Sequence, residues 1–154
     1  MGFLIIAVSI FVGELFIKSA LDRPWKKSGP KELFHGRVRV QTARNYGLVM
    51  NHLDENPELP AWISGIIFMI SLIFYFPTLF RKKVGKARRL GAALLLGGAA
   101  SNVYDRWRQG YVVDYLTVCW KKLKKIVFNL SDLCIFAGTF LLFITEFRNG
   151  KKGK

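Results

Sequence analysis

The chain has 154 residues, a length that suits one domain of ordinary size. Lys and Arg total 24 against 10 Asp and Glu, a net charge of +14, yet 51% of the residues are hydrophobic. Intrinsic disorder is excluded because it combines high charge with low hydrophobicity. A soluble nucleic-acid binder is disfavoured because the basic residues stand in blocks between long apolar runs. A multi-span membrane protein accounts for both properties, and we expect no nucleic-acid partner.

Four apolar stretches predict transmembrane helices in a single integral membrane domain, at about residues 2–17, 61–80, 90–104 and 130–147. The stretch 61–80 is the clearest because it is uncharged and about as long as a helix that crosses a ~30 Å hydrocarbon core. The first stretch has neither a basic n-region nor a cleavage site, so we expect a retained helix. Gly and Ala are frequent in 90–104, which favours close helix packing in lipid.

The distribution of Lys and Arg predicts the orientation of these helices. Residues 81–89 contain several basic residues and no acid, and the C-terminal tail is also basic. Both segments are therefore expected in the cytoplasm, facing anionic membrane lipids. Segments 18–60 and 105–129 are then external, although they also carry more basic than acidic residues.

The external segments contain three local patterns. Residues 37–42 alternate between polar and apolar side chains, which predicts a strand. Residues 54–60 contain two prolines and indicate a turn before the second helix. Trp120 and the lysine-rich residues 121–125 are typical of a segment at the depth of the lipid headgroups.

Two aspartates stand where an external segment enters the membrane. Asp132 begins the fourth helix, and Asp114 lies in the preceding loop, within residues 110–115. If the carboxylates meet, they can share one proton and activate water against an amide. From spacing alone the ordinary roles are favoured, a helix-dipole partner for Asp132 and a solvated loop acid for Asp114.

The other catalytic schemes lack their residues. Neither a His-Glu-x-x-His nor a Gly-x-Ser-x-Gly motif is present. Both histidines precede the second predicted span, and Cys134 lies in an apolar helix that disfavours a thiolate. We expect no metal site and no cofactor.

Three ordered motifs, at residues 97–106, 110–115 and 128–132, resemble those of the lipoprotein signal peptidase (signal peptidase II) family. Asn45-Tyr46-Gly47 and the segment from Glu14 to Lys18 are also similar to motifs of this family. The resemblance implies four transmembrane helices with a small extracytoplasmic β-sheet. It also implies an aspartic endopeptidase that cleaves prolipoproteins before a diacylglyceryl-modified cysteine.

The same resemblance assigns the site residues. Asp114 and Asp132 become the catalytic dyad. The residues that support the dyad or bind substrate are Asn45, Gly47, Asn102, Arg106, Asn129, Glu14 and Lys18. Several of these have an ordinary alternative role: Arg106 could pair with Asp105 or lipid phosphate, Asn129 could only cap the fourth helix, and Asn45 could only shape a turn.

The chain departs from the family pattern at four places. Glu14 stands where Asp is usual, Ser101 where Gly is usual, and Ser131 where Ala is usual. Leu48-Val49-Met50 replaces an expected Ala-Ala-Phe. The first and last departures imply a change in substrate fit or activity, while the dyad itself is intact.

The family resemblance places the chain in the bacterial cytoplasmic membrane, with its active site on the extracytoplasmic side, and we expect a monomer. Two alternatives remain at this point. One is a small ion- or proton-coupled transporter that uses Glu14 and Asp132. The other is a non-catalytic, lipid-binding paralogue. A transporter is expected to hold its acids near the bilayer midplane, often beside broken helices.

Overall fold

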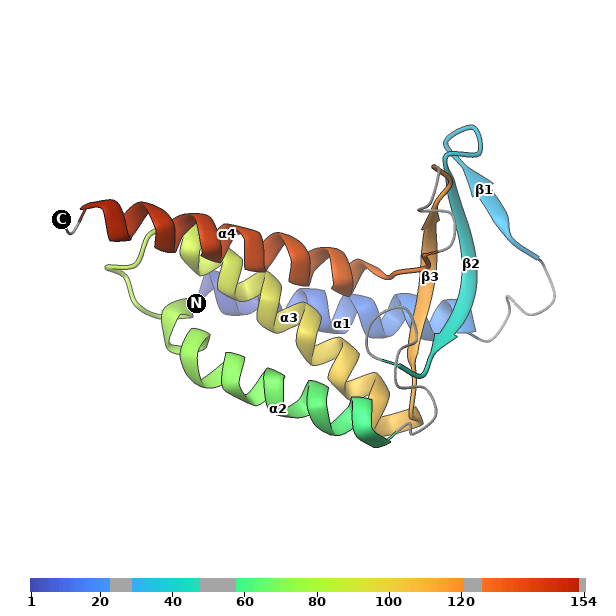
Figure 1. Ribbon diagram of the computed structural model, residues 1–154, viewed down its shortest axis with the longest axis horizontal. Helices are drawn as coiled ribbons and strands as arrows, with labels where there is room; N and C mark the ends of the chain where they lie inside the picture. The colour runs from blue at the N-terminus through green and yellow to red at the C-terminus, as the bar shows by residue number, and fades with distance from the viewer. Residues whose placement is uncertain (23–28, 48–57, 121–125, 153–154) are drawn as a thin grey trace.

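Four helices run alongside one another, and a three-stranded antiparallel sheet stands across one end of them (Figure 1). The computed structural model describes residues 1–22, 29–47, 58–120 and 126–152. In chain order the elements are α1 (Gly2–Asp22), β1 (Lys31–Leu33), β2 (Val38–Asn45), α2 (Glu58–Tyr75), η2 (Pro77–Leu79), α3 (Lys86–Gln109), β3 (Val112–Val118) and α4 (Leu130–Lys152).

Helix α3 forms the centre of the helical layer. Helices α1 and α4, and α2 together with η2, are long and apolar enough to cross a membrane. Helix α3 is less apolar and packs against all three of them. A Cβ on Gly98 would lie 2.6 Å from the backbone oxygen of Ser131 on α4, and one on Gly97 would lie 2.6 Å from that of Ala7 on α1. The close packing predicted from the Gly- and Ala-rich stretch is therefore confirmed.

Most helices extend beyond the apolar stretches that predicted them. Helix α1 continues to Asp22, and α3 continues to Gln109, so Asp105 and Arg106 lie on a helix instead of starting an external segment. Hydropathy marks only the apolar part of such a helix. Helix α3 stops at Gly110, whose φ of 79° suits glycine and whose N–H donates to the carbonyl oxygen of Arg106 at 3.0 Å.

The second predicted span is interrupted near its end. The span predicted at residues 61–80 corresponds to α2 and η2 together, which form one candidate membrane span, but α2 ends at Tyr75 and Pro77 begins the separate turn η2. Proline has no N–H to continue the α-helical hydrogen bonds. The chain tightens instead, and the N–H of Leu79 donates to the carbonyl oxygen of Phe76 at 3.1 Å.

Strand β2 is the central strand of the sheet, with the order β1-β2-β3. The strand predicted at residues 37–42 is confirmed, but it begins at Val38 and continues to Asn45. Asp114 was predicted in a loop, which is wrong: it lies in β3, opposite Ala43 of β2. The β-branched residues around Asp114 favour a strand.

Two sequence predictions fall mainly outside the described residues. Of the lysine-rich interfacial segment, residues 121–125 lie outside them, and Trp120 is exposed. Of the predicted turn at residues 54–60, residues 54–57 lie outside them, and α2 already begins at Glu58.

Candidate active site

Asp114 and Asp132 are brought to the same place by a short return of the chain. After β3 the chain comes back, and Phe128 pairs with Leu116 through backbone hydrogen bonds of 2.7 and 2.9 Å. Helix α4 then begins at Leu130, which places Asp132 in its first turn beside the strand that carries Asp114. Asp114 and Asp132, which are eighteen positions apart in the chain, thus lie close together.

Asn129 joins the two carboxylates. Its Nδ2 donates to Asp114 Oδ1 at 2.7 Å. Its Oδ1 accepts from the backbone N–H of Asp132 at 2.9 Å, and its own N–H donates to Asp132 Oδ2 at 3.1 Å. The latter two bonds form a reciprocal cap of α4. Asn129 therefore caps the helix, as its ordinary role predicts, and also holds Asp114 against Asp132.

The two remaining carboxylate oxygens accept amide hydrogen bonds as well. Asn45 Nδ2 donates to Asp114 Oδ2 at 3.1 Å, and Asn102 Nδ2 donates to Asp132 Oδ1 at 2.8 Å. Asn45 is the last residue of β2, so it does not form the turn considered from the sequence. Neutral amides thus hold both carboxyl groups without neutralising them, and either group can carry the proton.

Burial shifts the protonation of Asp114. The side chain lies on β3 and is almost fully buried. Burial, followed by the nearby charge of Asp132, raises the pKa of Asp114 to about 6, while hydrogen bonds from Asn45 and Asn129 and the charge of Lys18 act in the opposite direction. A carboxyl group with this pKa can exchange a proton near neutral pH.

Arg106, on α3, lies beside the dyad. Its Nη2 donates to the carbonyl oxygen of Gly47 at 2.9 Å, which fastens the end of β2 to the helix. The pairing with Asp105 considered from the sequence does not form. Asp105 pairs with Lys18 Nζ instead, at 2.8 Å.

Glu14 and Lys18 lie in a buried polar cluster behind the dyad. Lys18 Nζ donates to Asn102 Oδ1 at 2.9 Å and to Ser101 Oγ at 3.0 Å. Glu14 lies 3.4 Å from the same ammonium group and is fully buried. The two residues therefore support the site from behind and do not line the groove in front of it.

Asp114 and Asp132 both line an open groove of about 480 Å³. Asp132, Phe136 and Thr139, spaced three or four residues apart on α4, form one wall. The groove also contains Asn45, Asn102, Arg106, Val112, Asp114, Ile126, Val127, Phe128 and Ile135. It therefore leads from the two carboxyl groups along an apolar helix face.

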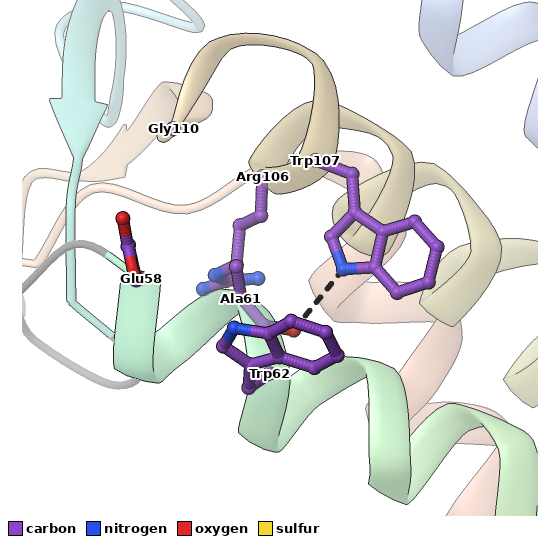
Figure 2. A pocket seen from close by; sticks show the side chains of 6 residues that line it. All are labelled: Glu58, Ala61, Trp62, Arg106, Trp107 and Gly110. Carbon is purple, nitrogen blue, oxygen red and sulfur yellow. Dashed lines mark hydrogen bonds between the residues drawn. The ribbon is translucent and has the colours of Figure 1, made fainter.

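A second hollow, of about 460 Å³, lies between α2 and α3. Figure 2 shows Trp62 and Trp107 beside it, and Trp107 Nε1 donates to the carbonyl oxygen of Ala61 at 3.3 Å. Arg106 reaches both this hollow and the groove of the dyad. The hollow contains neither dyad aspartate, so the candidate chemistry lies in the groove.

The sequence did not identify every residue of the site. Tyr115 and Asp105, both buried, were not assigned roles. Tyr115 directly follows Asp114 and ends the motif at residues 110–115, and these are the sequence signals that could have drawn attention to it. Within the described ranges, no group of three or more His, Cys, Asp or Glu side chains could hold a metal ion.

Comparisons with known sequences agree with the motifs. A family model described as "Signal peptidase (SPase) II" matches residues 6–148. A lipoprotein signal peptidase of Vibrio campbellii is 33% identical over 112 residues, which are 71% of this chain and 66% of that protein. A lipoprotein signal peptidase of Actinobacillus succinogenes is 32% identical over 114 residues, 71% of this chain and 68% of that protein. The chain thus spans about two thirds of the length of these relatives.

The fold is also similar to that of solved proteins. A bacterial membrane enzyme structure matches with a TM-score of 0.83 at 22% identity and covers 99% of this chain and 92% of that one. Another bacterial membrane enzyme structure matches with a TM-score of 0.76 at 23% identity, over 94% and 91% of the two chains. Both the helical layer and the sheet are therefore shared with known membrane enzymes.

Proposed function

We propose that this chain, which belongs to the signal peptidase II family, is an aspartic endopeptidase that removes signal peptides from prolipoproteins. Asp114 and Asp132 form its catalytic dyad. The observation that carries the proposal is the bridge made by Asn129, which hydrogen-bonds both carboxyl groups at the open end of an apolar groove.

The chemistry follows from a dyad that holds one proton. The ionised carboxylate takes a proton from water, and the water oxygen attacks the carbonyl carbon of the scissile amide. The protonated partner donates its proton to the carbonyl oxygen. When the tetrahedral intermediate collapses, the amide C–N bond breaks and the carboxyl group that took the water proton gives it to the leaving nitrogen. The partner carboxylate takes back a proton from the hydroxyl that becomes the carbonyl of the new carboxyl terminus. The pair returns to its singly protonated state and titrates as a unit.

The groove supports a substrate that arrives from the lipid. Its wall on α4 is apolar below Asp132, and Phe136 on that wall is exposed to the surroundings of the helices. From Asp132 to Thr139 the helix descends about 10 Å at ~1.5 Å per residue. A diacylglyceryl-modified cysteine anchored in the membrane would hold its preceding peptide bond at the depth of the dyad.

The activity is tested by incubating the purified chain in detergent with a prolipoprotein peptide that carries a diacylglyceryl cysteine. Mass spectrometry should detect the released signal peptide. A folded wild-type chain that releases none would contradict the peptidase and favour the non-catalytic paralogue. The transporter is disfavoured because α1 is unbroken and Glu14 is engaged by its neighbours.

We place the sheet and the dyad on the extracytoplasmic side of the bacterial membrane, because the basic segment 81–89 lies at the other end of the helices. After replacement of both native cysteines, Lys82→Cys should react with a membrane-impermeant thiol reagent only from the cytoplasmic side. Arg37→Cys, in the exposed turn between β1 and β2, should react only from outside. Both side chains are exposed in the wild-type chain. Reversed labelling would contradict this orientation.

Asn129→Ala and Arg106→Ala should lower kcat less than loss of a dyad aspartate, because neither residue transfers the proton. Loss of one positioning hydrogen bond typically costs ~10²-fold. Gln41→Ala is the matched control, since its amide bonds to Thr117 on the sheet at 3.1 Å and does not line the groove. Turnover is measured on variants with wild-type melting temperatures. A loss equal to that of the aspartate variants would give the residue a catalytic role.

A further inference from the structure

The carboxylate of Glu14 receives two hydroxyl hydrogen bonds from the elements that carry the dyad. Tyr115 on β3 donates to Glu14 Oε1 at 2.5 Å, and Ser131 on α4 donates to Glu14 Oε2 at 3.0 Å. Glu14 is fully buried on α1, and the two donors are buried as well. One side chain of α1 therefore holds both elements at a common point.

The two donors are the sequence neighbours of the dyad. Tyr115 follows Asp114, and Ser131 precedes Asp132. The Tyr115 hydroxyl also accepts from the backbone N–H of Leu130 at 3.2 Å, so it contacts the first residue of α4 directly. A displacement of either hydroxyl would move the adjacent aspartate relative to its partner.

The Tyr115 hydroxyl keeps its proton near neutral pH and therefore acts as the donor to Glu14. Burial raises the pKa of its hydroxyl, and the hydrogen bond to Glu14 raises it further. The proton therefore stays on the tyrosine oxygen, and the Glu14 carboxyl group that accepts its hydrogen bond lies 3.4 Å from the ammonium group of Lys18.

We propose that Glu14, Tyr115 and Ser131 form a positioning clamp that sets the separation of the two dyad carboxyl groups. These residues do not touch the substrate, since none of them lines the groove. The effect that we predict for the clamp on turnover rests on the proposed peptidase function. Its effect on the titration of the dyad is independent of any substrate.

The separation of two carboxylates determines how strongly they share a proton. The charge left by the first dissociation opposes the second, and this repulsion weakens with distance. A looser clamp therefore lets the second proton leave at a lower pH. The basic limb of the pH profile of kcat should move in that direction.

The test uses Tyr115→Phe and Ser131→Ala, which each remove one hydroxyl and little volume. We expect kcat to fall about 10- to 100-fold with KM nearly unchanged, because a small misplacement of catalytic groups carries such a cost. The basic limb should move to lower pH in both variants. Neither substitution removes a charge, and the charged groups around the dyad are retained, namely Glu14 and Lys18 on α1 and Asp105 and Arg106 on α3.

Ser71→Ala is the matched control, because this hydroxyl donates within α2, to the carbonyl oxygen of Ile67 at 2.8 Å, and does not line the groove. It should leave both kcat and the pH profile unchanged. A second readout does not depend on activity. Protein labelled with ¹³C at the aspartate carboxyl carbons is titrated and followed by NMR, and the Asp114→Asn and Asp132→Asn variants assign the two dyad signals.

The upper titration of the dyad should occur at lower pH in Tyr115→Phe and Ser131→Ala than in the wild type. An unchanged titration and an unchanged basic limb would overturn the clamp, even if the melting temperature fell, because the hydroxyls would then serve stability alone. If the wild type cleaves nothing, the proposed function fails and the NMR titration still decides on the clamp.

Discussion

Asp114→Asn and Asp132→Asn are each expected to lower kcat by about 10³-fold or more, because an amide can neither take a proton from water nor deliver one to the substrate. One remaining aspartate cannot act as base and acid in the same step. Asp22→Asn is the matched control, since this partly exposed carboxylate pairs with Arg44 at 3.6 Å at the sheet end of α1. Turnover is measured with the diacylglyceryl peptide in detergent.

The two variants should differ in stability. A new amide at position 114 can bond to Asn45 after that side chain turns over, because Asn45 Oδ1 is buried and has no hydrogen-bond partner within the described residues. At position 132 the neighbouring Asn102 cannot turn, since Lys18 holds its Oδ1 at 2.9 Å. The new amide N–H at position 132 then faces the N–H of Asn102, and two opposed donors typically lower the free energy of unfolding by about 1–3 kcal/mol.

We therefore expect Asp132→Asn to melt at a lower temperature than Asp114→Asn, with both folded under the assay conditions. Thermal unfolding followed by circular dichroism measures this difference. Wild-type turnover in either variant would exclude the two-carboxylate mechanism. Equal melting temperatures would show that Lys18 does not fix the orientation of Asn102.

The second large effect concerns the lipid on the substrate. A peptide with a diacylglyceryl cysteine should be cleaved, whereas the same peptide without lipid should have a kcat/KM at least ~10²-fold lower. Two acyl chains anchor a peptide stably in a membrane, at ~0.8 kcal/mol per buried CH₂. Such remote binding positions the scissile bond at the dyad and so contributes to the chemical step.

A third peptide, with two short acyl chains on the same glyceryl group, separates anchoring from recognition. If anchoring supplies the effect, this peptide should be cleaved almost as slowly as the unlipidated one. If it is cleaved as well as the long-chain peptide, the glyceryl thioether itself is recognised. Equal rates for all three peptides would refute lipid-dependent positioning, and the groove along α4 would then have another purpose.

The helices could be predicted from the sequence because hydropathy reports directly on residues that face lipid. Their polar ends could not, which is why α3 was predicted to end before Asp105 although it continues to Gln109. The strand around Asp114 was also missed. Its residues gain their strand partners from β2, which is distant in the chain, and no local pattern reports on such pairing.

The proximity of the two aspartates could be predicted only through the family motifs. Spacing alone favoured separate roles, since the contact depends on the return of Phe128 to β3 and on the cap made by Asn129. The hydrogen bond from Asn129 to Asp114 also could not be predicted from spacing, because it forms only when the fold brings Asp114 within reach of the Asn129 amide.

The departures from the family pattern have a common location. Ser101 bonds to Lys18, and Ser131 bonds to Glu14, so three of the four departures meet in the cluster behind the dyad. The sequence predicts that the Glu14 departure changes substrate fit or activity, and because its side chain lies away from the groove, we expect the change in activity, through the dyad. The fourth departure, at residues 48–50, lies outside the described residues.

Helix α4 has two faces that differ in their tolerance of change. On one face a Cβ at Gly138 would lie 2.6 Å from the backbone nitrogen of Leu95, so this face admits no larger side chain. The other face, with Phe136 and Thr139, borders the open groove. With the groove as the proposed substrate site, substitutions on the side with Phe136 and Thr139 would alter the lipid or peptide preference, while the side with Gly138 preserves the fold. Relatives with different substrates should diverge first at these groove positions.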